Sequence, residues 1–184
     1  MTVKELIEAL QQFHEDTFVY SEMRGFCDTQ YGPLNIQGCT STLEYDEKEI
    51  NIPKRKTKYS AGYDFEAAKD VTILPGYGKP TLVPTGIKAY MEDDEVLKIY
   101  NRSSNPSKKH IILANAVGII DKDYYGNENN DGEIFFAFFN IGNEEITIKK
   151  GDAIGQGIFQ KYLCVDNEEE ILNMRNGGFG STGK

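Results

Sequence analysis

The chain has 184 residues, of which 39% are hydrophobic and 27% charged, and its formal net charge is −9. These values are typical of a globular protein with one core, and the negative charge argues against a general nucleic-acid-binding protein, whose affinity depends on a positive surface. No apolar run is long enough for a membrane span, and we see no signal-peptide core. The three cysteines, Cys27, Cys39 and Cys164, lack metal-site spacing, so we expect free buried thiols and a cytoplasmic protein.

Residues 1–40 predict a small α+β extension. Thr2 and Glu5 have the form of a helix capping box. The apolar residues that follow have helical spacing and would share one face: Val3, Leu6, Ile7, Leu10 and Phe13. Two strand-like runs come next, at residues 18–20 and 34–36. We expect the apolar stripe to pack within the protein rather than to bind a partner.

Residues 41–165 carry mostly β signals. Short apolar or alternating runs, separated by Gly, Pro, Asn and Asp, predict strands at residues 71–74, 81–83, 87–91, 97–100, 111–113, 134–139, 146–148 and 153–159. Strands of this length and spacing are typical of a sandwich or barrel with antiparallel pairing. Residues 166–184 begin with an acidic run and end rich in glycine, which predicts a flexible arm without a core of its own.

Five sequence blocks point to function. They are Ala-Gly-Tyr-Asp at 61–64, Asn-Arg-Ser-Ser at 101–104, Asn-Ala-Val-Gly-Ile-Ile-Asp-Lys-Asp-Tyr-Tyr-Gly at 115–126, Gly-Asp-Ala-Ile-Gly-Gln at 151–156, and the glycine-rich block at 175–183. Any one block is weak evidence, since such turns are common. Together, in content and order, they resemble the motifs of the trimeric dUTP pyrophosphatases (dUTPases), over about two thirds of the chain.

The resemblance implies an all-β fold, a distorted jelly roll of the β-clip type, with residues 1–40 as an extension. It implies hydrolysis of dUTP to dUMP and pyrophosphate with Mg²⁺ as cofactor. It also implies a homotrimer whose active sites are shared between subunits, with the arm at 166–184 closing over nucleotide bound on a neighbouring subunit.

Asp121 is the predicted catalytic residue. Attack at the α-phosphorus needs a positioned water, and a carboxylate within hydrogen-bond reach can orient that water and accept its proton. The resemblance assigns this role to Asp121. The alternative is an aspartate that merely ends a strand.

Base and sugar recognition is predicted in the same block. Asn115 and the backbone of Gly118, Ile119 and Ile120 resemble the uracil-reading hairpin; buried polar groups built for one base reject another strongly. Tyr124 resembles the tyrosine that packs under the deoxyribose and leaves no room for a 2′-hydroxyl. Its alternative is an ordinary packed aromatic.

The phosphate and metal groups are predicted in the first, second and fourth blocks. Arg102, Ser103, Ser104 and Gln156 resemble phosphate-binding residues, for which an arginine fork and hydroxyl donors are suited. Asp64 resembles the acid that supports Mg²⁺ through water; because Mg²⁺ keeps waters and shares substrate phosphates, one carboxylate is sufficient. The alternative for Asp64 is a turn aspartate that caps local N–H groups.

The last block resembles a lid. Phe179 would stack on uracil, Arg175 would pair with the γ-phosphate, and Gly180, Ser181 and Thr182 would wrap the outer phosphates. The block is not a Walker A loop, because the Gly-Lys-Ser/Thr ending is missing.

Four features depart from the family pattern. Ala153 stands where many members have arginine, and the spacing from Arg175 to Phe179 is one residue shorter than usual. The stretch from Asn127 to Asp131 lengthens a loop as in phage-type members, which favours the host cytoplasm as the location. Residues 1–40 have no counterpart in minimal members, and trimer contacts, binding of a host protein and solubility are all open roles for them.

Two alternatives remain at this stage. A dCTP deaminase, or a bifunctional deaminase-dUTPase, shares the fold but needs a glutamate base beside the pyrimidine; Glu133 is the nearest candidate, and its offset from Asp121 does not suit that role. A nucleotide-sensing regulatory protein, with an unknown protein partner, is the second alternative and predicts slow turnover.

Overall fold

The computed structural model describes residues 36–38, 50–168 and 177–178. All of them belong to one of two compact units of the chain, Asn35–Lys184. The predicted N-terminal helix and the strand-like run at 18–20 lie outside the described residues, as do Cys27 and Cys39. Cys164 is a free thiol but is exposed, so its predicted burial is wrong.

The described unit is built almost entirely from short strands, and every run predicted as a strand from residue 71 onward contains one. The strands are β1 (Ile36–Gly38), β2 (Tyr63–Glu66), β3 (Val71–Ile73), β4 (Gly76–Pro84), β5 (Ile87–Ala89), β6 (Glu95–Asn101), β7 (Ile111–Leu113), β8 (Val117–Ile120), β9 (Phe135–Asn140), β10 (Ile146–Ile148) and β11 (Ala153–Lys161). Two short helical turns interrupt them, the π-helical η2 (Asn105–Lys109) and the 3₁₀ turn η3 (Lys122–Tyr124). Among the described residues no helix is long and apolar enough to cross a membrane.

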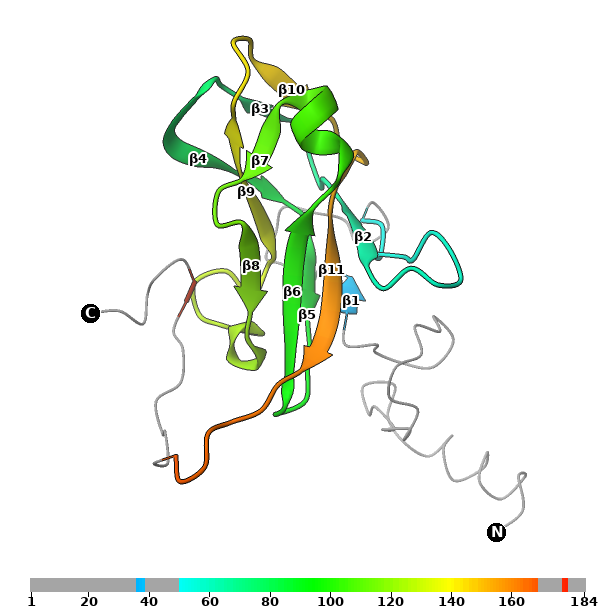
Figure 1. The fold of residues 1–184 in the computed structure, drawn as a ribbon, viewed down its shortest axis with the longest axis vertical. Helices are drawn as coiled ribbons and strands as arrows, with labels where there is room; N and C mark the ends of the chain where they lie inside the picture. Colours follow the sequence, from blue (N-terminus) through cyan, green and yellow to red (C-terminus); the bar gives the residue numbers. More distant parts are fainter. Residues whose placement is uncertain (1–35, 39–49, 169–176, 179–184) are drawn as a thin grey trace. The chain divides into compact units, whose positions relative to one another are not determined.

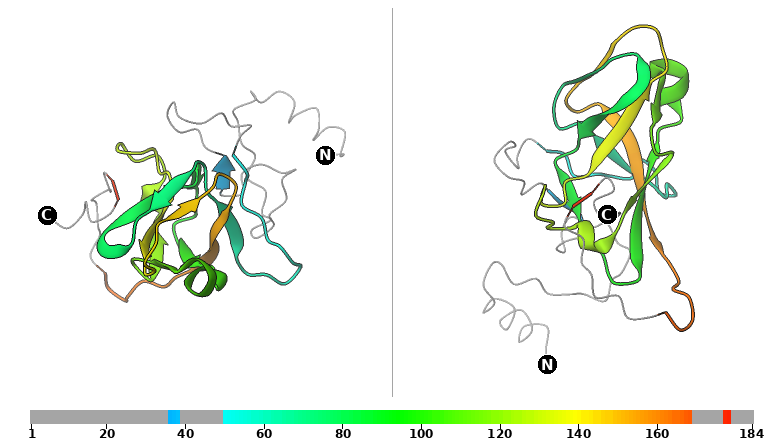
Figure 2. Two further views of the ribbon diagram at one scale, coloured as in Figure 1. Left: turned by 90° about the horizontal axis from the view of Figure 1, so that it is seen from above. Right: turned by 90° about the vertical axis from the view of Figure 1, so that its left-hand side faces the viewer.

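The strands form four antiparallel sheets. The largest has the order β2-β11-β6-β8, the second has the order β4-β9-β7, and β1-β5 and β10-β3 form pairs. Figure 1 and the right-hand view of Figure 2 show β11 running beside β6, although more than fifty residues separate the two strands in sequence. This arrangement confirms the all-β, distorted jelly-roll fold.

Three phenylalanines form the centre of the core. Phe65 on β2 and Phe136 and Phe138 on β9 are fully buried, and the ring of Phe136 lies 5.7 Å from that of Phe65 and 6.1 Å from that of Phe138. They join the four-stranded and three-stranded sheets into one hydrophobic cluster. Full burial of a side chain of this size contributes about 1.5–3 kcal/mol, so this junction holds in place the sheet that carries the predicted site.

Candidate functional site

The predicted site residues that the structure describes lie on the four-stranded sheet and on the turns next to it. Asp64 on the edge strand β2 is opposite Gln156 on β11, Gln156 is opposite Tyr100 on β6, and Tyr100 is opposite Val117 on the other edge strand, β8. Residues that oppose one another in an antiparallel sheet point to the same face. Asp64 and Gln156 are therefore neighbours on one face of the sheet.

The second block lies against the fourth. The Arg102 Nη1 donates to the Ala153 carbonyl at 3.2 Å. Asn105, which is buried, donates from Nδ2 to the Ile154 carbonyl at 2.8 Å and to Asn101 Oδ1 at 2.7 Å. These bonds tie the turn that carries exposed Ser103 and half-buried Ser104 to the start of β11. The structure thus brings Arg102, the two serines and the start of β11 together, with the Ala153 carbonyl as the acceptor for Arg102.

Gly62 allows the Gln156 side chain to lie close to the first block. A Cβ at position 62 would stand 2.4 Å from Gln156 Oε1, so any larger residue would displace the amide. Asp64, half-buried, lies within β2 rather than in a turn, which removes the alternative of a turn-capping aspartate. Among the described residues no group of three or more His, Cys, Asp or Glu side chains could hold a metal ion by itself. One carboxylate beside one amide suits Mg²⁺ that is held mainly by phosphates and water.

The third block comprises the turn after β7, the strand β8 and the residues that follow it, including η3. β7 leads through a turn, in which Ala116 has a φ of 58°, into β8. Asn115 is exposed in that turn, and a Cβ at Gly118 would lie 3.3 Å from Asn115 Nδ2. Because β8 is an edge strand, part of its backbone N–H and C=O groups faces away from β6 and can bind the edge of a planar base. Gly118, Ile119 and Ile120, the predicted uracil-reading residues, belong to this strand.

Asp121 follows β8 directly and precedes η3. Its backbone oxygen accepts a hydrogen bond from the Tyr124 N–H at 3.1 Å, whereas its half-buried side chain makes no capping hydrogen bond to the turn. Lys122 beside it is paired with Asp93, and the hydrogen bond from this pair raises the pKa of Lys122. Burial, and then the negative charges of Cys164 and Asp121, raise the pKa of Tyr162, whose hydroxyl donates to the Asp93 carbonyl at 2.8 Å.

Tyr124 is buried at the end of η3. Its hydroxyl donates to the Glu133 carbonyl at 2.9 Å and accepts a hydrogen bond from Asn130 Nδ2 at 2.8 Å. Gly178 lies against its ring, since a Cβ at position 178 would stand 2.7 Å from Tyr124 Cε2. The arm therefore touches the hairpin of its own chain at this point. The sequence analysis missed Asn130; the lengthened Asn-rich loop was its signal.

The remaining predicted residues of the arm lie outside the described residues: Arg175, Phe179, Gly180, Ser181 and Thr182. Glu133, the base that a deaminase would need, accepts a hydrogen bond from the Gly86 backbone N–H at 3.0 Å through Oε1. The carboxylate thus fastens the chain between β4 and β5, as expected of a structural residue.

Within one chain, the described residues predicted to bind phosphate and Mg²⁺ do not converge with Asp121. β2 and β8 are separated by β11 and β6, which at about 4.8 Å per strand places Asp64 roughly 14 Å from β8. Val117 on β8 lies in the same cross-strand row as Asp64, through Gln156 and Tyr100. Asp121 is four residues beyond Val117, which adds about 13 Å along the strand direction.

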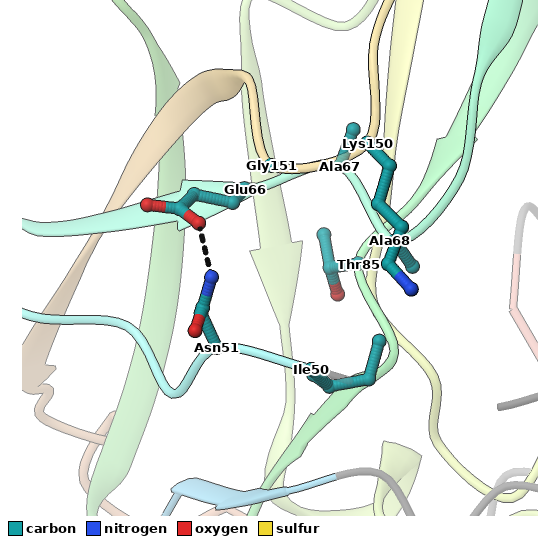
Figure 3. Close-up of a pocket in the computed structure, with 8 residues that line it drawn as sticks. All are labelled: Ile50, Asn51, Glu66, Ala67, Ala68, Thr85, Lys150 and Gly151. Atoms are coloured by element: carbon teal, nitrogen blue, oxygen red, sulfur yellow. Dashed lines mark hydrogen bonds between the residues drawn. The ribbon is translucent and has the colours of Figure 1, made fainter. Parts of the chain in front are cut away.

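A hollow of about 280 Å³, open to solvent, lies elsewhere on the unit (Figure 3). It is lined by Ile50, Asn51, Glu66, Ala67, Ala68, Thr85, Lys150 and Gly151, none of which is a predicted site residue. Asn51 donates from Nδ2 to Glu66 Oε2 at 2.8 Å across its mouth (Figure 3). Asn51 and Glu66 bond each other, and Thr85 Oγ1 donates to the Ile134 carbonyl at 2.7 Å. Since no predicted nucleotide-binding residue lines the hollow, it is not part of the predicted site.

Comparison with known proteins gives consistent matches. The sequence profile of dUTPase matches residues 48–183. A deoxyuridine 5'-triphosphate nucleotidohydrolase of Lactococcus lactis subsp. lactis (strain IL1403) is 50% identical over 151 residues, which cover 82% of this chain and 99% of the relative. The corresponding protein of Rickettsia typhi is 39% identical over 137 residues, 72% of this chain and 88% of the relative.

Solved structures agree. The crystal structure of dUTPase from Streptococcus mutans has a TM-score of 0.66 and 41% identity, and the match covers 72% of this chain and 99% of that one. A dUTPase mutant from phage phi11 of S. aureus, in which a structural Mg(II) ion is coordinated, has a TM-score of 0.57 at 16% identity, with 75% of this chain and 95% of that chain covered. The second match concerns the fold alone.

Proposed function

The chain belongs to the dUTPase family, and from this premise we infer that it hydrolyses dUTP to dUMP and pyrophosphate. The observation that carries the inference is the exit of β8, where an edge strand with open backbone groups leads directly to Asp121 and Tyr124. Base, sugar and reacting phosphorus are consecutive parts of one nucleotide. A strand edge, a carboxylate and an aromatic ring within eight residues provide one group for each of these parts.

We assign the chemical step to Asp121. Its carboxylate orients a water for in-line attack at the α-phosphorus and accepts a proton as the P–O bond forms and pyrophosphate leaves. Asn115 and the backbone of Gly118, Ile119 and Ile120 bind uracil, and Tyr124 lies under the deoxyribose.

The triphosphate is bound by the groups gathered on β2, β11 and the η2 turn. Arg102, Ser103, Ser104 and Gln156 donate to phosphate oxygens, and Asp64 would hold Mg²⁺ through water. Mg²⁺ would neutralise charge on the phosphates. From the arm, Arg175 pairs with the γ-phosphate, Phe179 covers the base, and Gly180, Ser181 and Thr182 wrap the outer phosphates, which excludes bulk water.

We propose that the working form is a homotrimer with sites shared between subunits. The support is the separation of Asp64 from Asp121, about 14 Å across the sheet and about 13 Å along it. This separation is longer than the distance that one triphosphate can span between an α-phosphorus at Asp121 and a metal ion at Asp64. Asp121 of one chain must then meet Asp64 and Gln156 of another. The subunit whose nucleotide the arm covers stays a prediction, as do the cytoplasmic location (the host's, for a phage-encoded chain) and the role of residues 1–40.

The experiment is pyrophosphate release from dUTP, dCTP, dTTP and UTP with Mg²⁺, for wild type, Asp121→Asn and the matched control Asp166→Asn on an exposed turn. We expect release from dUTP alone, a loss of about 10²–10⁴-fold in kcat for Asp121→Asn, and no change for the control. Ammonia release from dCTP would indicate a deaminase. Tight dUTP binding without turnover would indicate a nucleotide-sensing protein.

A further inference from the structure

The loop after Tyr125 and Gly126 is held by a network of asparagine side chains. Buried Asn127 donates from Nδ2 to the Tyr124 carbonyl at 2.8 Å and to Asn130 Oδ1 at 2.7 Å. Its own Oδ1 accepts from the backbone N–H groups of Asn129 at 3.1 Å and Asn130 at 3.3 Å. A loop whose amides bond one another in this way has a defined shape, although it contains no regular secondary structure.

Asn130 connects this network to the Tyr124 ring. Its Nδ2 donates both to the Tyr124 hydroxyl at 2.8 Å and to the Glu133 carbonyl at 3.0 Å, and its Oδ1 accepts from the Gly132 N–H at 3.3 Å. The same Glu133 carbonyl accepts the Tyr124 hydroxyl hydrogen at 2.9 Å. The phenol oxygen is thus both donor and acceptor, which determines the position of the far end of the ring.

The far side of the loop is attached to the body of the protein. Asp131 forms an ion pair with Lys88 on β5 at 2.7 Å, with 10% of the lysine side chain and 30% of the aspartate side chain exposed. The same Lys88 Nζ lies 4.8 Å from the centre of the Tyr125 ring, a cation–π contact. The loop therefore cannot move away from Tyr124 without breaking contacts to the buried strand β5. This attachment holds the loop that carries Asn130.

We propose that Asn130 is a positioning residue for sugar selection: by holding the Tyr124 phenol oxygen, it keeps the ring where it excludes a ribose 2′-hydroxyl. The proposal rests on the proposed function, since it presumes that Tyr124 lies under the deoxyribose. A ring rejects one extra oxygen only if it cannot move away by about the width of that oxygen. Tyr124 supplies the surface, and Asn130 keeps that surface in place through its hydrogen bond to the phenol oxygen.

The test compares kcat/KM for dUTP and UTP in wild type, Asn130→Ala, Tyr124→Phe, Tyr124→Ala and the double variant Asn130→Ala/Tyr124→Phe, with Asn143→Ala, on an exposed turn, as the matched control. We expect Asn130→Ala to lower the dUTP/UTP ratio about tenfold, mainly through faster turnover of UTP. In the Tyr124→Phe background, which lacks the hydroxyl that Asn130 holds, we expect Asn130→Ala to cause no further loss. Asn143→Ala keeps the wild-type ratio.

Each result decides the proposal. It is overturned if Asn130→Ala keeps the wild-type dUTP/UTP ratio of kcat/KM while Tyr124→Ala loses it. It is also overturned if Asn130→Ala lowers this ratio equally with and without the Tyr124 hydroxyl, because that result would mean a general loosening of the loop. A wild type that releases no pyrophosphate from dUTP removes the proposed function itself. A Tyr124→Ala variant that still rejects UTP leaves the dUTPase activity standing but removes the sugar role of Tyr124, and with it the role of Asn130.

Discussion

Gly155 offers the sharpest test of how the core holds the site. It lies on β11 immediately before Gln156 and is buried. A Cβ at this position would stand 1.9 Å from Phe136 Cε1 and 2.6 Å from both Cδ1 and Cζ of the same ring. The contact is with the ring of a fully buried side chain, so Gly155→Ala forces either β11 or Phe136 to move.

The Phe136 ring has little room in which to move. It is bounded by Phe65 at 5.7 Å and Phe138 at 6.1 Å between ring centres, and all three side chains are fully buried. Overpacking of such a core costs about 1–3 kcal/mol. In a domain of this size, each kcal/mol lowers Tm by about 2–4 °C, so we expect Gly155→Ala to lower Tm by roughly 2–12 °C.

The assay is thermal unfolding of Gly155→Ala beside Gly78→Ala. Gly78 is an exposed strand glycine at which a Cβ would meet nothing within 4 Å, so its variant should stay within about 0.5 kcal/mol of wild type. Phe136→Leu should restore part of the loss in the Gly155→Ala background, because a smaller side chain leaves space for the new methyl. Equal Tm values for the two glycine variants, or no coupling with Phe136→Leu, would refute the reasoning.

Three further predictions concern the site and one ion pair. Asp64→Asn should raise the Mg²⁺ concentration needed for half-maximal pyrophosphate release about tenfold; an unchanged Mg²⁺ titration would remove the metal role. Gly178→Ala, whose Cβ would meet the Tyr124 ring at 2.7 Å, should raise KM for dUTP with little change in Tm, and a wild-type KM would show that this contact plays no part in substrate binding. Hydrogen bonds from Lys149 and from the Lys150 N–H lower the pKa of Asp70 below 3.8. The ionised Asp70 carboxylate therefore stabilises the folded state above its unfolded-state pKa of 3.8, and this stabilisation is lost as the pH falls through the lower folded-state pKa. Thermal unfolding of Asp70→Asn should therefore differ from that of wild type at pH 7 and converge with it in acid.

Much of the fold was predictable because its signals are local. Alternating apolar residues and turn-forming Gly, Pro and Asn predict the strands from β3 onward, apart from β8. β2 and β8 were not predicted as strands, because their sequences were interpreted as binding motifs. Their strand character comes from pairing with β11 and β6, which no short window of sequence contains.

Contacts around Tyr124 illustrate the same limit. The tyrosine was identifiable from its block, but its partners were not. Asn130 lies in a loop whose asparagines predict only turns, and their mutual hydrogen bonds depend on how the chain doubles back between η3 and β9. Gly178 belongs to the fifth sequence block and Tyr124 to the third, so only folding brings the glycine against the tyrosine ring.

The sequence by itself determined the family and most of the strand positions, because block order and hydrophobic alternation are local features of the chain, and the same block order predicts Asp121 as the catalytic residue. The tertiary structure alone decided that Asp64 and Asp121 stand at opposite edges of one sheet. That placement follows from the late strand β11 entering between β2 and β6. Hydrogen bonds between segments about ninety residues apart select this order, and such long-range pairing is a property of the whole fold rather than of any local pattern.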